Sequence, residues 1–323
     1  MPAPAAAPSP VRLHIVTGKG GTGKTTVAAA LAVALASGGR RVLLTEVEGR
    51  QGLAQLFDTP PLPYEERRVA VAPGHGEVVA LAMDPEEALL DYLDMFYNLR
   101  RAGRMLKRLG AVDFATTVAP GMRDVLLTGK LKEAVDRKTK GQPVYDAVVV
   151  DAPPTGRITR FLNVSAEVGT LARVGPVKGQ ADSVMRVLRS PRTAVHLVTV
   201  LEEMPVQETV DGVAQLRSAN LPVGHIVVNM RRAPYALPAR LPRTMVAAGL
   251  KAAGLSPTKP TVDGLRSEAA ELQTRLALEH RESEDLAGLG VPLLSLPLLV
   301  GPVDRGGLYR LAEELTAGGL GPP

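Results

Sequence analysis

The sequence predicts an α/β protein built on a doubly wound, mostly parallel sheet that is flanked by helices. Three observations carry this prediction. Short apolar runs rich in β-branched residues alternate with helical stretches along the chain, as such a sheet requires. A glycine-rich loop separates the first apolar run from the first helical stretch. An aspartate, Asp151, closes a later apolar run, and the carboxyl ends of parallel strands are where such sheets bind ligands.

Seven apolar runs are predicted as strands, and they cover residues 13–17, 41–45, 78–83, 145–151, 194–201, 225–229 and 293–296. The first helix is expected over 26–37. Residues 84–142 have a helical pattern without a strand, so a helical insert is predicted over about 85–141. Residues 231–262 are rich in proline and basic residues and are expected to cross irregularly to a helix over about 264–286. Residues 11–323 are thus predicted to form a single domain, preceded by a disordered lead-in over 1–10.

Composition narrows the class of protein. The chain has 323 residues, of which 45% are hydrophobic and 22% charged, as in ordinary globular proteins. It has no apolar run of the roughly 18 residues that a membrane span needs, and its first residues lack the pattern of a signal peptide. The absence of cysteine excludes disulfides, thiolate-bound zinc and iron–sulfur clusters. A net charge of +5 permits an acidic partner, whereas ten aromatic residues and no tryptophan disfavour nucleic acid.

The glycine-rich loop has the pattern of a phosphate-binding loop, Gly18-Lys19-Gly20-Gly21-Thr22-Gly23-Lys24-Thr25. In such a loop the backbone N–H groups surround phosphate oxygens, the final lysine reaches the β- and γ-phosphates, and the following hydroxyl holds Mg²⁺. A helix N-terminus, which favours anions, follows directly at Thr26. The pattern therefore predicts a P-loop NTPase that binds ATP through residues 18–26, with Lys24 as a catalytic cation and Thr25 as a magnesium ligand.

Lys19 gives the loop an additional cation directly after its first glycine. The arrangement resembles the deviant Walker A motif of nucleotide-dependent dimeric NTPases, which include partition, arsenite-pump and tail-anchored-protein-targeting ATPases. The resemblance implies that Lys19 crosses a dimer interface to the partner's nucleotide. The alternative is an ordinary solvated lysine.

A second motif follows the apolar run that ends at Asp151. An acidic residue in this position faces the phosphates and is suited to hold the water shell of Mg²⁺. Residues 151–162 resemble the switch II segment of the arsenite-pump and tail-anchored-targeting family, with matches that include Asp151, Pro154, Thr155 and Gly156. Ala152, Pro153 and Arg157 depart from the family pattern. The alternative for Asp151 is a helix cap.

Glu48 stands where the switch I segment of that family carries the aspartate that positions the attacking water. A carboxylate that is one methylene longer can still orient water if the loop retracts, so slow hydrolysis is expected. Glu46 is the competing candidate, and a solvated loop carboxylate is the third interpretation.

Three further positions match the family's nucleotide contacts. Glu202 begins a segment that, by resemblance, contacts nucleotide from the facing subunit. Asn229 ends a predicted strand where the family places an asparagine against the adenine edge, and an amide offers both the donor and the acceptor this edge needs. Pro297 opens a segment that loosely resembles the base-covering loop.

The helical insert carries many apolar residues. In tail-anchored-targeting relatives the corresponding helices form a methionine-rich groove for a hydrophobic helix, so a hydrophobic client is one expectation. Packing on the nucleotide core is the other, because only Met95, Met105 and Met122 lie there. Residues 100, 104 and 108 form a basic helical face. This face is either solvated or a docking site for an acidic partner or an anionic membrane surface.

Together these residues predict a cytoplasmic, Mg²⁺-dependent ATPase of the arsenite-pump and tail-anchored-targeting family, in an actinobacterial branch, with peripheral membrane contact as a further option. It is expected to work as a homodimer or as a heterodimer with a paralogous ATPase. Three alternatives remain at this stage. They are a partition-type ATPase that binds DNA, a nucleotide-binding module that does not hydrolyse ATP, and a small-molecule kinase that uses Glu48 on a hydroxyl.

Overall fold

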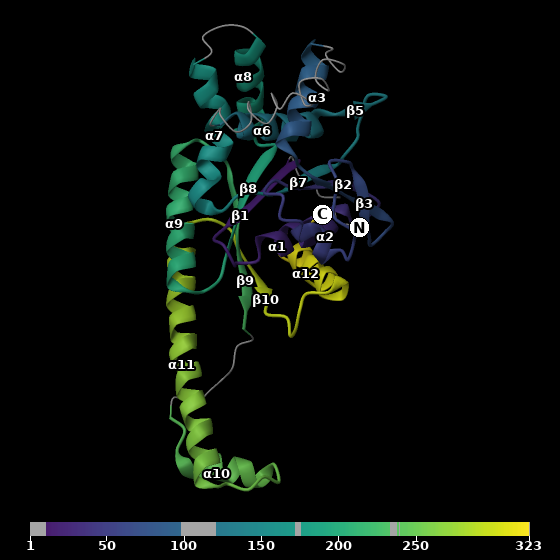
Figure 1. Cartoon of the computed structure of the whole chain (residues 1–323). Helices are drawn as coiled ribbons and strands as arrows, with labels where there is room; N and C mark the ends of the chain where they lie inside the picture. The colour runs from purple at the N-terminus through teal and green to yellow at the C-terminus, as the bar shows by residue number, and fades with distance from the viewer. Residues whose placement is uncertain (1–10, 98–120, 172–175, 233–237, 239, 323) are drawn as a thin grey trace, which may run out of the picture.

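In the computed structural model an eight-stranded sheet runs through the protein in the order β10-β9-β8-β1-β7-β2-β4-β3 (Figure 1). The structure describes residues 11–97, 121–171, 176–232, 238 and 240–322. All neighbouring strands are parallel except β3, which is antiparallel to β4 at the edge. The doubly wound, mostly parallel α/β fold is therefore confirmed.

All seven predicted strands are present, with ends that shift by a few residues. They are β1 (Leu13–Gly18), β2 (Arg41–Glu46), β4 (Gly76–Ala82), β7 (Ala147–Asp151), β8 (Thr193–Thr199), β9 (Val223–Arg231) and β10 (Leu293–Pro297). The edge strand β3 (Arg67–Ala72) has no counterpart among the predictions. It is joined to β4 by a three-residue turn, Pro73–His75, in which Gly74 and His75 both have positive φ.

Helices cover both faces of the sheet. One face packs against α1 (Lys24–Ala36), the short α2 (Gly52–Leu56) and α12 (Arg305–Ala317). The other packs against α6 (Met122–Asp136), α7 (Thr155–Leu171), α8 (Pro176–Leu188) and α9 (Glu203–Ser218). Residues 27–36 of α1 are all buried, because their small side chains allow close packing between the sheet and α12. This packing fixes the start of α1, and with it the glycine-rich loop.

The described part of the insert is mainly helical and contains α3 (Pro85–Tyr97) and α6. The residues of the predicted basic face, 100, 104 and 108, and Met105 lie outside the described residues. The prediction that 84–142 carries no strand is wrong. Lys138–Thr139 (β5) pairs with Gln142–Pro143 (β6) in a small hairpin, because Lys140 and Gly141 adopt positive φ and turn the chain back.

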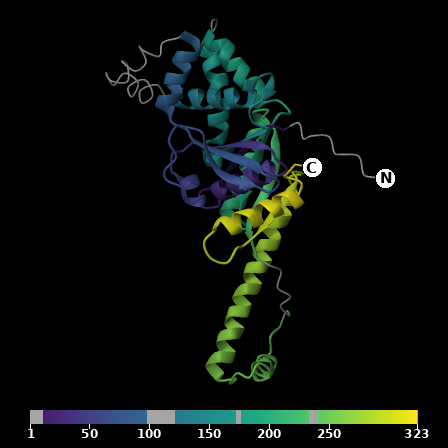
Figure 2. The ribbon, with the colours of Figure 1, turned by 90° about the vertical axis from the view of Figure 1, so that its right-hand side faces the viewer.

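An extended arm replaces the predicted irregular crossing. It consists of α10 (Arg243–Ala252) and α11 (Lys259–Ala287), and it projects away from the sheet (Figures 1 and 2). The prediction that 231–262 lacks helix is therefore wrong, and α11 begins five residues before the predicted start at Gly264. The Thr258 hydroxyl caps α11 by accepting from the Thr261 N–H, and Pro260 occupies its first turn. With 29 residues, α11 is about 43 Å long.

No helix among the described residues is both long and apolar enough to cross a membrane.

Candidate nucleotide-binding site

The glycine-rich loop joins β1 to α1 at the carboxyl edge of the sheet, between β7 and β8. Two of its glycines, Gly18 and Gly23, are required by the close approach of neighbouring strands. A Cβ at Gly18 would lie 2.1 Å from the Val198 carbonyl oxygen, and one at Gly23 would lie 2.3 Å from Asn229 Nδ2. Gly23 also has a φ of +86°, which side chains disfavour. The loop can therefore bring its backbone N–H groups to a phosphate only because these positions lack side chains.

The two predicted magnesium ligands lie together. Thr25, in the first turn of α1, donates a hydrogen bond of 2.7 Å from Oγ1 to Oδ2 of Asp151 at the end of β7. Burial raises the pKa of Asp151 to about 6, although the bond from Thr25 and the charge of Lys24 favour its ionised form. Lys24 lies in the loop with Nζ 3.4 Å from the Lys19 carbonyl oxygen, and burial lowers its pKa. A buried carboxylate and a desolvated ammonium are thus held side by side under the loop.

The residues around Asp151 fit a hard divalent cation. Glu46 ends β2 in register with Asp151, and the charge of Glu46 contributes to the raised pKa of Asp151. Glu46 accepts from the Leu53 N–H at 3.2 Å through one oxygen. Its other oxygen is buried and finds no hydrogen-bond partner in the part of the chain that the structure describes. A hydroxyl and two close carboxylates, one with a free oxygen, match the oxygen donors and retained waters that Mg²⁺ prefers.

Lys19 contacts its own chain. Its Nζ forms an ion pair with Glu208 on α9, and the other oxygen of Glu208 accepts from the Thr155 hydroxyl at 3.1 Å. Thr155 is the first residue of α7, so Pro154 lies just before the helix and Gly156 is its second residue. The Thr17 hydroxyl holds the same segment through the Pro153 carbonyl oxygen at 2.7 Å. The sequence prediction missed Glu208, although this glutamate lies in the matched segment 202–209.

Glu48 and Glu46 occupy different environments. Glu48 lies between β2 and α2 with its side chain 19% exposed, and it faces two arginines. Its carboxylate is 3.2 Å from Arg50 and 3.7 Å from Arg157 in the first turn of α7. Glu46 is buried and is engaged by the backbone of α2, so of the two carboxylates it is the one fixed in place. Of the two candidates for the carboxylate that positions the attacking water, Glu48 is the one that solvent can reach.

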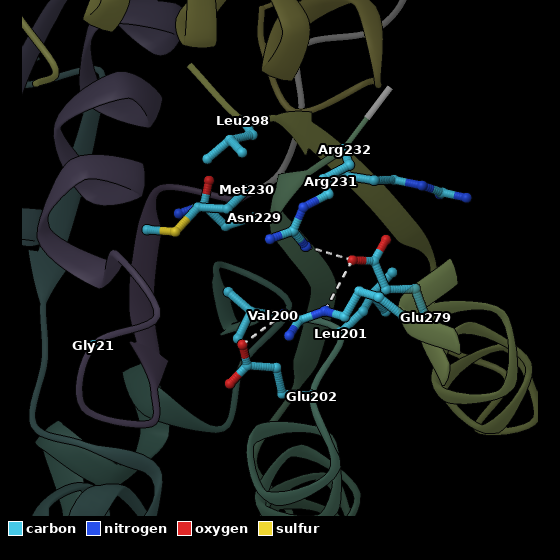
Figure 3. Close-up of a pocket in the computed structure, with 11 residues that line it drawn as sticks. Gly21, Val200, Leu201, Glu202, Asn229, Met230, Arg231, Arg232, Glu279 and Leu298 are labelled. Atoms are coloured by element: carbon cyan, nitrogen blue, oxygen red, sulfur yellow. Dashed lines mark hydrogen bonds and ion pairs between the residues drawn. The ribbon is translucent and has the colours of Figure 1, made fainter. Parts of the chain in front are cut away.

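A cavity of about 200 Å³ opens beside the loop (Figure 3). The Asn229 side chain forms part of its wall and donates 2.9 Å from Nδ2 to the Thr22 carbonyl oxygen, which ties β9 to the loop. Leu298, directly after Pro297, also lines the cavity (Figure 3). The lining residues come from five segments of the chain and are Gly21, Val200, Leu201, Glu202, Asn229, Met230, Arg231, Arg232, Arg275, Glu279 and Leu298.

Ion pairs close one side of this cavity against α11. Glu202 lies 2.8 Å from Arg275, and Arg275 and Arg232 both contact Glu279, at 3.4 Å and 2.6 Å (Figure 3). Glu202 is thus bound within its own chain. Of the predicted site residues, Asp151 and Asn229 contact the loop directly, through Thr25 and Thr22. Thr155 is linked to Lys19 through Glu208. Glu202 lines the cavity, whereas Pro297 is not among its lining residues and directly precedes one of them, Leu298.

A glycine-rich loop between the central strand and a buried helix, with a Thr–Asp pair beneath it, defines the P-loop NTPase class. The chain belongs to the anion-transporting ATPase family, whose model matches residues 11–191. The ATPase BagA of Mycobacterium tuberculosis is 53% identical over 321 residues, which cover 97% of this chain and 94% of the relative. An equally similar ATPase occurs in Mycobacterium bovis, and these relatives confirm the predicted actinobacterial branch.

More distant relatives carry the two names of the predicted family. The ATPase GET3 of Kluyveromyces lactis is 26% identical over 253 residues, which cover 68% of this chain and 71% of the relative. The arsenical pump-driving ATPase of Escherichia coli is 24% identical over 322 residues, which cover 93% of this chain and 48% of that protein. The chain therefore spans about half the length of the pump ATPase.

Proposed function

We propose that this ATPase-family chain hydrolyses ATP to ADP and phosphate in a Mg²⁺-dependent reaction and acts as a nucleotide-driven dimeric switch. The observation that carries the proposal is the hydrogen bond between Thr25 and Asp151 beside Lys24, directly beneath the glycine-rich loop. These three side chains supply the cation and the oxygen ligands that phosphoryl transfer from a nucleotide needs.

In this proposal Lys24 and the loop N–H groups bind and orient the β- and γ-phosphates. Thr25 and Asp151 hold Mg²⁺, which when bound neutralises charge that develops on the transferred phosphoryl group. Glu48 orients a water for in-line attack on the γ-phosphate and receives its proton. Arg50 and Arg157 bind the Glu48 carboxylate. These two ion pairs must weaken or break before the carboxylate can move toward the water.

The dimeric switch rests on Lys19. We infer that its ion pair with Glu208 belongs to the open state, and that nucleotide closure transfers its ammonium to the partner's phosphates. Glu208 also accepts from Thr155, so the same transfer removes the cation that holds this carboxylate at the start of α7, and we propose that this loosens the segment. The partner is a second copy of this chain or a paralogous ATPase. We further propose that the helical insert responds to this loosening by binding a hydrophobic helical client, because α6 and α7 pack against each other.

A second candidate function follows from the environment of Glu48. Two arginines bind its carboxylate, and such ion pairs disfavour the swing of a catalytic base. If Glu48 stays bound when ATP enters, the chain is a nucleotide-binding module that depends on a paralogous ATPase for hydrolysis.

Steady-state phosphate release with ATP and Mg²⁺, with the mass measured by light scattering in the same buffer, tests the proposal. We expect the wild-type chain to turn over ATP. We expect Glu48→Gln to abolish turnover while it still binds ATP. Glu65→Gln is the matched control, because that side chain is 72% exposed and lies in the segment that leads into β3. Tight ATP binding without turnover by the wild-type chain would instead support the non-hydrolysing module. Unchanged turnover in Glu48→Gln would assign the water to another carboxylate.

A further inference from the structure

The α10–α11 arm carries its most exposed end far from the nucleotide site (Figures 1 and 2). Helix α10 folds back on the first turns of α11, and the contact buries Leu250 of α10 and Val262 of α11. One face of α10 is therefore already packed against α11 within the arm. Its other face is turned to solvent.

This outer face is apolar as well. Met245, Ala248, Ala252 and Leu255 are spaced by three, four and three residues, which aligns them along one side of the helix and its end. Met245, Ala248 and Ala252 lie on α10 itself, whereas Leu255 follows its end, after Gly254 with a φ of +74°. All four are exposed, and the two large ones have exposed fractions of 53% for Met245 and 59% for Leu255. A helix that packs on one neighbour normally presents polar residues to water on its outer side. A contiguous exposed apolar stripe on α10 therefore indicates a contact that the isolated chain does not make.

The stripe is surrounded by positive charge. Residues 240–266 contain the basic residues Arg240, Arg243, Lys251, Lys259 and Arg266 and one acidic residue, Asp263, so five positive charges and one negative charge give a net +4. This segment of 27 residues is therefore strongly basic, in a chain of 323 residues whose net charge is +5. Asp263 is paired with Arg243 at 2.8 Å, which leaves the remaining basic residues as the local excess.

We propose that this arm tip, residues 240–266, docks on the surface of an anionic phospholipid bilayer. Protruding apolar side chains flanked by lysine and arginine match a bilayer interface, where the side chains enter the acyl boundary and the cations meet anionic headgroups. A bilayer needs no shape complementarity, which suits residues that project from the end of an arm. The rest of the ATPase would be held away from the membrane by the length of α11.

A fluorescence experiment tests the insertion of the stripe. The chain has no tryptophan, so Met245→Trp and Leu255→Trp each introduce a single reporter at an exposed position. With vesicles of equal parts phosphatidylcholine and phosphatidylglycerol, both reporters should shift to the blue and be quenched by brominated acyl chains. Val71→Trp is the matched control, since Val71 is 48% exposed on β3 in the body of the molecule. No shift in the two arm variants, or an equal shift in the control, overturns the proposal.

Vesicle sedimentation tests the charge requirement with otherwise native protein. Binding to the anionic vesicles should exceed binding to pure phosphatidylcholine vesicles and fall with added salt. Lys251→Gln with Lys259→Gln should weaken it about tenfold or more. The exposed Arg310→Gln on α12 should leave it unchanged, and ATP affinity should be equal in all variants. If the double variant and the control sediment alike, or if zwitterionic vesicles bind as well, the arm tip does not recognise anionic lipid.

Discussion

At the scale of single residues, Lys24 is the cation on which nucleotide binding depends in the proposed function. Burial lowers the pKa of Lys24, whereas the negative charges of Asp151 and Glu48 favour its protonated form, which is the form that binds phosphate. Lys24→Ala should weaken ATP binding by at least about 30-fold, because removing one member of a buried charge pair costs about 2 kcal/mol or more. Isothermal titration calorimetry measures this directly. Lys19→Ala serves as the control and should retain binding, and equal loss in both variants would contradict the separate roles.

Gly23 gives a steric prediction that needs no nucleotide. Its positive φ and the position of Asn229 Nδ2, 2.3 Å from where a Cβ would lie, both oppose a side chain. Gly23→Ala should therefore lower the free energy of unfolding by roughly 1–3 kcal/mol in denaturant titrations. Gly20→Ala is the matched control, because no atom lies within 4 Å of its Cβ position. Adding Asn229→Ala should restore the part of the loss due to the clash, and purely additive effects would exclude it.

At the scale of elements, a row of histidines links three strands. His14 on β1 and His196 on β8 are buried, with His14 Nδ1 3.1 Å from His196 Nε2, and the His225 N–H of β9 donates to His196 Nδ1 at 3.2 Å. The second bond makes His196 Nδ1 an acceptor, so the proton of neutral His196 is on Nε2. Burial lowers the pKa of His14 to about 4 and that of His196 well below its ordinary value.

Lowered histidine pKa values in the folded state make stability depend on pH. Below about pH 6.5 the unfolded chain binds protons that the folded chain excludes, so this contribution to stability is present above that pH and is lost as the pH falls toward 4. His14→Gln, which cannot be protonated, should reduce the slope of the unfolding free energy over this window by up to about 1.4 kcal/mol per pH unit. His280→Gln on the exposed surface of α11 should not change it. Equal slopes in denaturation curves of all three proteins would contradict the prediction.

The elements that sequence reasoning found are those with a buried apolar core. β1, β7 and β8 are apolar runs rich in β-branched residues, because both faces of a central parallel strand are covered. This pattern made them recognisable as strands. β3 was missed because its side chains are partly exposed and its arginines mask the alternation. For a similar reason α10 was missed and the start of α11 was predicted too late, although most of α11 was predicted. α10 has one fully buried residue, and α11 only four along its 29. The Thr258 cap and Pro260 were available signals for the start of α11.

The site shows the same division. The loop, Thr25 and Asp151 were predictable, since a local motif and the topology of a parallel sheet together bring them to one edge. The ion pair of Lys19 with Glu208, and that of Glu202 with Arg275, join residues that are 189 and 73 positions apart. Such pairs depend on how α9 and α11 pack, which no local pattern encodes.

At the scale of the whole molecule, the proposed switch predicts how dimerisation responds to the Lys19–Glu208 pair. In a Glu48→Gln background, which is expected to prevent turnover under the proposed function, ATP with Mg²⁺ should convert the chain into a closed dimer that light scattering and small-angle scattering detect. Lys19→Ala should remove the nucleotide-dependent part of this change. Glu208→Gln should act in the opposite direction and lower the protein concentration at half-dimerisation, because the neutral amide no longer competes with the partner's phosphates for the ammonium. Thr155 keeps an acceptor in this variant through the amide oxygen, so loss of that bond cannot explain the shift.

If Glu208→Gln dimerises no more readily and Lys19→Ala closes as before, the ion pair is a static feature of the fold and the switch must rest on other residues. If the chain pairs with a paralogous ATPase, the same opposite shifts should appear only when that partner is added.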